Sequence, residues 1–410
     1  MKGAVLAVGT ELLLGDVINS NAAWLGQRLA AAGVEVIASA AVGDDHDRLV
    51  AAIEEHLREA DVLILCGGLG PTVDDLTREA VAAACDAPMT RQPWIEEQLR
   101  AKFAAYGIDM PDMVLQQADV PAGAEVLDNP AGTAPGLWLA VGDRLVIALP
   151  GPPHELRAVA APVWPRLAQL SGSVVTTRQV LVAGLGETAV AERVQAAIAL
   201  PAGVSLSYLA GGSIVRLRFT TSGDPSVLEP LVAAADEVLG QNVWGHDDQT
   251  LEGVVHELLA AAGQTVAVAE SLTGGLLGAA LTARPGSSAS YRGGVVVYAT
   301  DLKQALAGVP ADVLTEHGAV SEQTALALAR GVRERLGADW GLAVTGVAGP
   351  DEQEGQPVGT VFVGIAGPAG EHVRRLRLPG DRDRVRALTV TQALDQLRRH
   401  LLGLPVVGSG

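Results

Sequence analysis

Residues 264–275 read QTVAVAESLTGG and set the fold of the last third of the chain. The short apolar run at 264–269 is typical of a buried strand, and the glycine pair that follows opens a helical pattern. Working outward, strands are predicted at 293–299, 340–345, 358–366 and 371–378, and helices at 250–262, 321–336 and 382–402. This alternation predicts a layered α/β domain over residues 250–410.

Ser271 comes directly after that first strand, so its hydroxyl is expected at the end of the sheet beside helix N–H groups. A serine nucleophile needs a base, and no histidine of this domain is suitably placed. Lys303 and Tyr298 follow the strand at 293–299 and belong to the corresponding edge. A lysine acts as a base when burial lowers its pKa from about 10.4. The alternatives stay open: a polar turn residue for Ser271, an amphipathic core edge for Tyr298, and an exposed helix charge for Lys303.

The N-terminal part has the same alternation. Apolar runs at 3–8, 34–40 and 61–66 are separated by helical patterns at 19–32 and 45–60, which predicts a parallel sheet with helices on both faces, a doubly wound domain. Further elements are predicted as helices at 74–85, 91–106 and 153–168, and as a hairpin of strands at 137–141 and 144–149 around Gly142-Asp143.

A glycine-rich loop, CGGLGPTVDD at 66–75, lies where a buried strand ends and a helix begins. Ligands bind at such strand ends in open α/β sheets. The glycines let backbone N–H groups approach an anion, and Thr72 adds a hydroxyl. Asp74 and Asp75 then occupy the start of the helix, where acidic residues are favoured as caps in any case. Glu11 follows the first strand, so it is expected at the same edge of the sheet, or it is a solvated loop carboxylate.

Between these domains, residues 171–249 show strands at 174–183, 203–209 and 213–221 and helices at 187–198 and 225–239. We predict a small α+β domain here and interpret it as a structural connector, since the segment contains no obvious chemical constellation. The sequence therefore predicts three domains, 1–170, 171–249 and 250–410.

Composition excludes several function classes. The formal net charge of −18 argues against a direct nucleic-acid-binding surface, which needs clustered Lys and Arg. Two cysteines without a CxxC pair argue against a disulfide framework or a structural zinc site. No window reaches the ~18 apolar residues of a membrane span, so we expect no membrane insertion and a cytoplasmic location.

The N-terminal strings GTELLLGD (9–16), GGLGPTVDDLTREA (67–80), NPAGTAPG (129–136) and LPGPPHEL (149–156) resemble the molybdopterin-binding-like domain of the competence/damage-inducible CinA family. The resemblance implies hydrolysis of ADP-ribose by this domain, with a divalent metal such as magnesium and help from potassium. A cation would neutralise charge on the diphosphate and activate water. The candidate metal ligands are Asp74, Asp75 and Glu11, with Glu11 alternatively a base. The candidate substrate-binding residues are Gly67, Gly68, Gly70, Thr72, Gly132 and Thr133.

The C-terminal strings AESLTGG (269–275), PGSSASYRGGVVVYATDLK (285–303), GAVSEQTA (318–325), AVTGVAGP (343–350), PVGTVFVGI (357–365) and GDRDRVR (380–386) resemble the nicotinamide-nucleotide amidohydrolase domain of the same family. This implies conversion of nicotinamide mononucleotide to nicotinate mononucleotide and ammonia, with no cofactor. By the resemblance Ser271 is the nucleophile, Tyr298 and Lys303 assist proton transfer, and Thr345 and Ser288 line the site. Further contacts are expected from Thr273, Gly274, Gly275, Gly346 and Gly349, with N–H groups near Gly274 and Gly275 holding the oxyanion.

One segment departs from the family pattern: DEQEG at 351–355 stands where a Gly-Gly-Thr stretch is usual, which puts nucleotide affinity in question. The sequence favours a bifunctional pyridine-nucleotide salvage enzyme, and two other functions are alternatives. One is a non-catalytic interaction protein in competence or recombination, acting through a protein partner, and the other is a molybdopterin-binding module. Small nucleotides are the expected partners, and a homodimer is the expected assembly.

Overall fold

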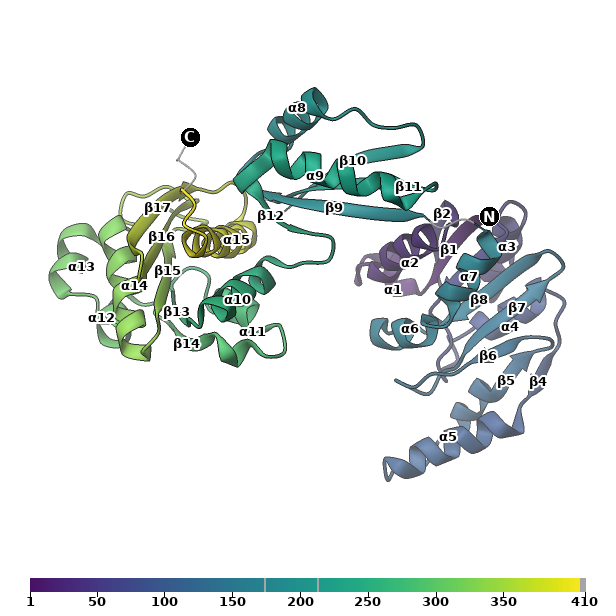
Figure 1. Ribbon diagram of the computed structural model, residues 1–410. Coiled ribbons are helices and arrows are strands. Elements are labelled where there is room, and N and C mark those ends of the chain that lie inside the picture. Colours follow the sequence, from purple (N-terminus) through teal and green to yellow (C-terminus); the bar gives the residue numbers. More distant parts are fainter. Residues whose placement is uncertain (173–174, 212–213, 406–410) are drawn as a thin grey trace. The chain divides into compact units, whose positions relative to one another are not determined.

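The computed structural model describes residues 1–172, 175–211 and 214–405 (Figure 1). The chain forms two compact units. The first comprises Met1–Thr176 with Thr221–Pro225, and the second comprises Thr177–Thr220 with the chain from Ser226 onward. The middle segment that the sequence sets apart at 171–249 thus belongs mostly to the second unit.

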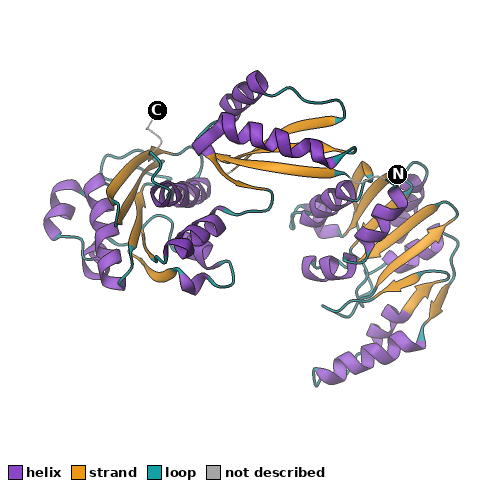
Figure 2. Ribbon diagram, viewed as in Figure 1, coloured by secondary structure: helices purple, strands orange, loops and turns teal. Residues whose placement is uncertain are grey.

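The first unit is built on a six-stranded sheet (Figure 2). Four neighbouring strands are parallel, and each of the last two strands pairs antiparallel with the strand before it in spatial order. This confirms the predicted doubly wound α/β domain. The predicted hairpin is also confirmed, with Gly142 at φ +60° in the turn. In spatial order the strands are β2 (Glu35–Val42), β1 (Lys2–Val8), β3 (Val62–Cys66), β8 (Arg144–Leu149), β7 (Gly136–Val141) and β6 (Glu125–Leu127).

Helices cover both faces of this sheet, and the central strand β3 is therefore buried on both sides. Val62 and Ile64 pack in one core with α2 (Ser20–Ala31), α6 (Pro153–Ala160) and α7 (Val163–Ser171). Leu63 and Leu65 pack in the other with α3 (His46–Leu57), α4 (Thr77–Ala84) and α5 (Pro93–Ala105). The prediction of one helix over 153–168 is wrong: Pro162 divides it, since proline has no N–H for an internal helical hydrogen bond. The short elements are α1 (Thr10–Leu14), β4 (Met89–Arg91) and β5 (Asp119–Pro121).

The second unit contains two sheets. The smaller has the order β10 (Val204–Gly211), β11 (Ile214–Thr221), β9 (Thr176–Ala183), β12 (Val243–His246). The helices α8 (Glu187–Ala197) and α9 (Leu228–Leu239) share its core. The sequence pattern identified three of these strands, in part outside the described residues at 174 and 213, and missed β12. That strand is only four residues long and has no clear alternation.

The larger sheet of this unit is five-stranded, and its order confirms the layered α/β prediction. Its strands are β14 (Tyr291–Val296), β13 (Val266–Glu270), β15 (Trp340–Gly346), β16 (Thr360–Gly367) and β17 (Gly370–Arg377), of which the first three are parallel. One face is covered by α10 (Leu251–Ala262), α11 (Leu276–Thr282) and α15 (Arg382–Leu401). The other is covered by α12 (Thr300–Ala307), α13 (Ala311–His317) and α14 (Glu322–Leu336).

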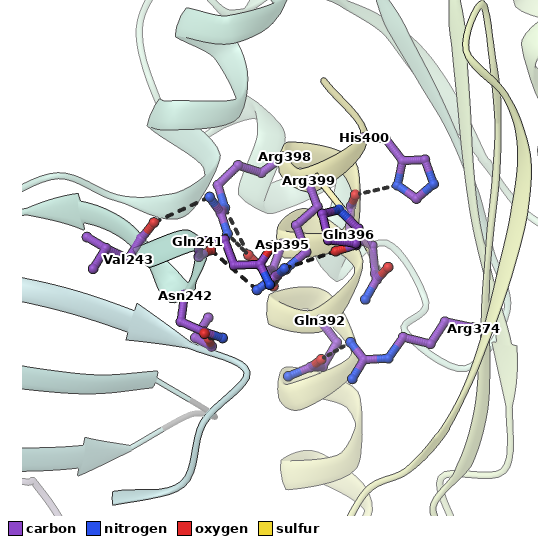
Figure 3. Close-up of polar contacts among 12 residues, drawn as sticks. Gln241, Asn242, Val243, Arg374, Gln392, Asp395, Gln396, Arg398, Arg399 and His400 are labelled. Atoms are coloured by element: carbon purple, nitrogen blue, oxygen red, sulfur yellow. Dashed lines mark hydrogen bonds and ion pairs between the residues drawn. The ribbon is translucent and has the colours of Figure 1, made fainter. Parts of the chain in front are cut away.

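A buried ionic cluster joins α15 to the smaller sheet (Figure 3). Asp395 accepts hydrogen bonds from Arg398 Nε at 2.9 Å and from Arg399 Nε at 3.0 Å, and all three side chains are at most 2% exposed. Arg398 also donates to the carbonyls of Val243 and Gln241, and Arg399 to that of Gln241. The two sheets of the second unit are therefore connected through charged hydrogen bonds as well as apolar contacts.

Candidate functional site

A cavity of about 420 Å³ opens at the carboxyl ends of β13 and β15, where the sequence predicts the serine site. This size falls in the range of small-molecule sites. Ser271, Tyr298, Lys303 and Thr345 all line it, so the structure brings the four predicted catalytic residues together. The other lining residues are Leu272, Ala299, Thr300, Ala319, Val320, Gly346, Val347, Ala348, Gly349, Pro350, Asp351, Glu352, Gln353 and Arg382.

Lys303 is on α12 and is only 2% exposed, which rules out an exposed helix charge. Its amine Nζ donates to Ser271 Oγ at 3.2 Å, to the Val297 carbonyl at 2.8 Å and to the Tyr298 carbonyl at 3.3 Å. Burial lowers the pKa of Lys303, and the charge of Glu354 opposes this in part. A neutral amine keeps two N–H donors for the two carbonyls and directs its lone pair at the serine hydroxyl. This is the geometry of a serine and its base.

Glu270 holds the turn on which Ser271 sits. The Glu270 carboxylate is 2% exposed and accepts hydrogen bonds from the N–H groups of Gly275, Leu277 and Gly278 at 2.7–3.0 Å. It satisfies the free donors at the start of α11 and places a negative charge at the helix N-terminus. Sequence reasoning assigned no role to this residue. Its position could have indicated one, because the carboxylate is next to the serine and five residues before the glycine at which the helix begins.

The expected oxyanion donors differ from those in the structure. The N–H of Gly275 is bonded to Glu270, and that of Gly274 to the Ser271 carbonyl at 3.1 Å, so neither faces the cavity as a free donor. In the described part of the chain, the N–H of Leu272 donates no hydrogen bond, and Leu272 lines the cavity. The N–H of Leu272 is therefore available as a donor at the cavity, whereas those of Gly274 and Gly275 are already bonded.

Tyr298 is placed for binding more than for proton transfer. Its side chain is 59% exposed at the cavity, and its hydroxyl accepts a hydrogen bond from Arg382 Nη2 at 3.0 Å. Lys303 contacts the carbonyl of Tyr298, and none of the described hydrogen bonds joins the amine to the phenol. Arg382 also donates to the Gly349 carbonyl at 2.7 Å. Arg382 was quoted within GDRDRVR but given no role, and the structure adds it to the site.

Among the remaining predicted residues, Thr345, Gly346 and Gly349 line the cavity, whereas Thr273, Gly274, Gly275 and Ser288 do not. Thr345 is fully buried and its hydroxyl donates to the Ala319 carbonyl at 2.7 Å. Thr273 is also fully buried, with no partner for its hydroxyl in the structure. Ser288 lies exposed in the short turn after α11.

The unusual loop at 351–355 forms part of the cavity wall. Asp351, Glu352 and Gln353 line the cavity, and Glu354 Oε2 accepts a hydrogen bond from the Val320 N–H at 3.1 Å. The acidic loop thereby anchors the segment beneath it and places two carboxylates at the cavity, while Arg382 and Lys303 supply the opposite charge.

In the first unit, the glycine-rich loop lies at the carboxyl end of β3. Gly67 adopts φ +104° and a side chain there would meet the Val8 carbonyl oxygen at 2.3 Å, so only glycine fits. The loop carbonyls are occupied: Thr77 donates to Gly67, and the buried Arg78 donates to Leu69 and Gly70. Arg78 is a residue that sequence reasoning did not assign.

Asp75 has a structural role in this loop. Its carboxylate accepts hydrogen bonds from the Gly70 N–H and from both the N–H and the hydroxyl of Thr72 at 2.6–2.8 Å. Asp75 therefore closes the loop and does not cap α4, whose N-cap is Leu76 without a side-chain hydrogen bond. It occupies the donors of Gly70 and Thr72 that we expected to face an anion. Asp74 is exposed, and the neighbouring Thr72 hydroxyl lowers the pKa of its carboxyl.

The predicted metal ligands are not gathered in the structure. Glu11 is exposed and its carboxylate folds back over Gly9. Within the described ranges, no three His, Cys, Asp or Glu side chains are grouped as a metal ion requires. The donor chemistry of Asp74 and Glu11 suits magnesium, which commonly takes one or two protein carboxylates and completes its shell with water and substrate phosphates. Two carboxylates would supply only part of the shell of such an ion.

The loop at 129–136 is fixed by its own polar contacts. Asn129 donates to Glu155 Oε2 at 2.6 Å and to the Ala134 carbonyl, while Lys102 donates to the carbonyls of Asn129 and Gly132. A side chain at Gly132 would collide with the Glu155 carboxylate. Thr133 lines a separate small cavity of about 60 Å³ beside Asn129. Asn129 and Glu155 were quoted within motifs and left unassigned.

Both the N-terminal and the C-terminal part of the chain match known protein families. Residues 248–401 match the family described as "CinA C-terminal domain", and residues 4–169 match "Probable molybdopterin binding domain". A CinA-like protein of Frankia casuarinae is 47% identical, covering 99% of this chain and 97% of its own. A CinA-like protein of a Synechococcus strain is 44% identical, covering 97% and 98%.

Among solved structures, the protein CinA with unknown function from Thermoplasma acidophilum is 35% identical, with a TM-score of 0.39, and covers 40% of this chain and 97% of its own. No helix among the described residues is long and apolar enough to cross a membrane. Given the two matched domains and the relatives that extend over nearly the whole length, the chain belongs to the CinA family.

Proposed function

We propose that the C-terminal domain is a serine amidohydrolase that converts nicotinamide mononucleotide to nicotinate mononucleotide and ammonia. The observation that carries this proposal is the buried Lys303 amine 3.2 Å from Ser271 Oγ in a cavity of about 420 Å³. A lysine of lowered pKa can take the serine proton where no histidine is present.

In this mechanism Ser271 Oγ attacks the carboxamide carbon and its proton passes to Lys303 Nζ. The Leu272 N–H is the candidate donor to the oxyanion. The Lys303 ammonium then protonates the departing amide nitrogen, which leaves as ammonia, and an ester on Ser271 remains. Water attacks that ester, Lys303 takes the water proton, and the proton returns to Ser271 as the carboxylate product departs.

The charges around the cavity support a zwitterionic substrate. Nicotinamide mononucleotide has a cationic pyridinium ring and an anionic phosphate. Asp351 and Glu352 line the cavity as candidates to face the ring, and Arg382 is the candidate to face the phosphate. Tyr298, held by Arg382, offers an aromatic face to the ring. The acidic loop is thus compatible with the nucleotide.

Ammonia release from nicotinamide mononucleotide by the full chain tests the proposal. We expect Ser271→Ala to lower kcat by at least about 1,000-fold. Ser287→Ala is the matched control, because Ser287 lies outside the cavity and donates only to the Arg284 carbonyl. Retention of ammonia release by purified Ser271→Ala protein would refute the mechanism.

We also infer that the N-terminal domain hydrolyses ADP-ribose with a divalent metal. The supporting observation is the convergence of loops at one edge of the parallel sheet. The Gly67 N–H donates to the Leu149 carbonyl, and Asn21 donates to the Gly151 carbonyl, so loops after β3 and β8 meet there with the first turn of α2. Asp74 and Glu11 are the candidate ligands. A bound metal would neutralise charge on the diphosphate and lower the pKa of water.

This second activity is tested by AMP formation from ADP-ribose, with and without magnesium. Asp74→Asn is expected to reduce metal-dependent turnover, whereas Ser271→Ala leaves it unchanged. If Ser271→Ala removes both activities, the two-site hypothesis is wrong.

A further inference from the structure

A second and larger cavity, of about 640 Å³, lies in the second unit away from Ser271. We call it the arginine pocket. It is bounded by the loop before α8, the outer strand β17, and single residues from α14, β16 and α15. Its lining residues are Gly184, Leu185, Gly186, Glu322, Thr360, Arg374, Arg375, Leu376, Arg377, Leu378, Pro379 and Gln392. None of them lines the catalytic cavity.

The pocket carries a concentration of positive charge in a chain whose formal net charge is −18. Arg374, Arg375 and Arg377 line it, against the single carboxylate of Glu322. No ion pair among the described residues uses any of the three arginines. Arg375 and Arg377 are exposed, and Arg375 donates a hydrogen bond to the side-chain oxygen of Gln356 at 3.3 Å.

The polar atoms at the pocket are only partly satisfied. Arg374 donates to Gln392 Oε1 at 3.2 Å (Figure 3), but its Nε is buried without a partner. Burial lowers the pKa of Arg374, which means that its charge is costly in this surrounding. Thr360 is 1% exposed, and its hydroxyl is buried with no hydrogen-bond partner among the described residues. Thr360 lies opposite Arg377 in the pairing of β16 with β17, so the two side chains share one face of the sheet. An anion with several acceptor oxygens could accept hydrogen bonds from both.

The loop before α8 adds backbone donors. Gly184 adopts φ +79°, and Gly186 begins the 11-residue helix α8 with no side-chain cap. The first N–H groups of such a helix lack intrahelical partners and carry the positive end of the helix dipole. This helix start therefore faces the pocket with the same preference for negative charge as the arginines.

We propose that the arginine pocket binds a small phosphate-bearing molecule of about the size of a nucleoside monophosphate. The phosphate lies against Arg375 and Arg377, which point to the same face of β17, and within reach of the loop at 184–186. Arginine is suited to this because its planar fork donates two parallel hydrogen bonds to phosphate oxygens. The volume leaves space for a sugar and a base beside the phosphate. The pocket has no serine–lysine pair, so we assign it binding and not turnover.

Isothermal titration of the full chain with AMP, with inorganic phosphate as competitor, tests this site. The variant is Arg375→Gln with Arg377→Gln, since both side chains are exposed and their replacement leaves the core intact. Arg193→Gln is the matched control: Arg193 is exposed on α8 and does not line the pocket. We expect the double variant to lose one AMP site, or to bind there at least about tenfold more weakly, and the control to match the wild type.

A crystal structure of the full chain with AMP distinguishes this site from the other candidate nucleotide sites. Phosphate density beside Arg375 and Arg377 supports the proposal. AMP density only in the first unit or beside Ser271 overturns it, and so do identical isotherms for the wild type and the double variant. Melting temperatures equal to that of the wild type show that the variants remain folded.

Discussion

The Lys303 amine and the Ser271 hydroxyl lie 3.2 Å apart, and neither side chain is more than 8% exposed. Two carbonyls, from Val297 and Tyr298, fix the position of the amine. The pair is therefore assembled before substrate binds, and its reactivity depends on the protonation state of the lysine.

The first prediction concerns pH. Proton removal from Ser271 requires the neutral form of Lys303, whose fraction rises with pH. Since burial lowers the pKa of Lys303 below its ordinary 10.5, the rate should rise with pH and reach half its maximum below that value. The measurement is the pH dependence of kcat/KM for ammonia release. A midpoint at or above 10.5, or a rate that falls as the pH rises, would contradict a neutral lysine base.

The second prediction concerns Arg382. Replacing it with Gln removes its hydrogen bonds to the Tyr298 hydroxyl and the Gly349 carbonyl, and removes a positive charge from the cavity. We expect KM for nicotinamide mononucleotide to rise about 10- to 100-fold, with a smaller effect on kcat. For nicotinamide riboside, which has no phosphate, the rise in KM should be much smaller. Arg384→Gln is the control, because Arg384 is exposed on the same helix outside the cavity; equal losses on both substrates would exclude the phosphate contact.

Much of the fold was predictable because apolar periodicity dictates which face is buried. The run at 61–66 predicted the fully buried β3, and the run at 264–269 predicted β13. The positions of Ser271 and Lys303 followed, since the carboxyl ends of parallel strands share one sheet edge. The four-residue β12 was not predictable from pattern, because its burial depends on pairing with β9.

The hydrogen-bond partners at the site were less predictable, because each residue type admits several. Thr345 lines the cavity as expected, but the partner of its hydroxyl, the Ala319 carbonyl, was not predictable. The glycines after Ser271 were expected to hold an oxyanion, yet Glu270 takes the N–H of Gly275. The sequence allowed Asp75 to be interpreted either as a metal ligand or as a helix cap. Such choices depend on which neighbour lies within 3 Å, and spacing in sequence does not determine that.

The third prediction separates Asp75 from Asp74. Asp75→Asn weakens three hydrogen bonds that close the loop at 70–75, so it should lower the free energy of unfolding of the first unit by about 1 kcal/mol, the typical net contribution of a hydrogen bond. Asp74→Asn changes an exposed side chain and should leave stability unchanged while reducing metal-dependent ADP-ribose cleavage. Scanning calorimetry and the AMP assay measure the two effects. If Asp75→Asn is as stable as Asp74→Asn, the role of Asp75 in closing the loop is wrong.

The fourth prediction concerns the ionic cluster that connects α15 to the smaller sheet. Asp395→Asn leaves Arg398 and Arg399 buried without a carboxylate, and loss of one partner from a buried pair costs about 3–5 kcal/mol. Glu371→Gln is the control in the same unit, because its pair with Arg330 is largely exposed and such pairs contribute about 0–1 kcal/mol. The calorimetric transition of the second unit should shift strongly for Asp395→Asn and little for Glu371→Gln. Equal shifts would show that the carbonyls of Gln241 and Val243 alone satisfy the two arginines.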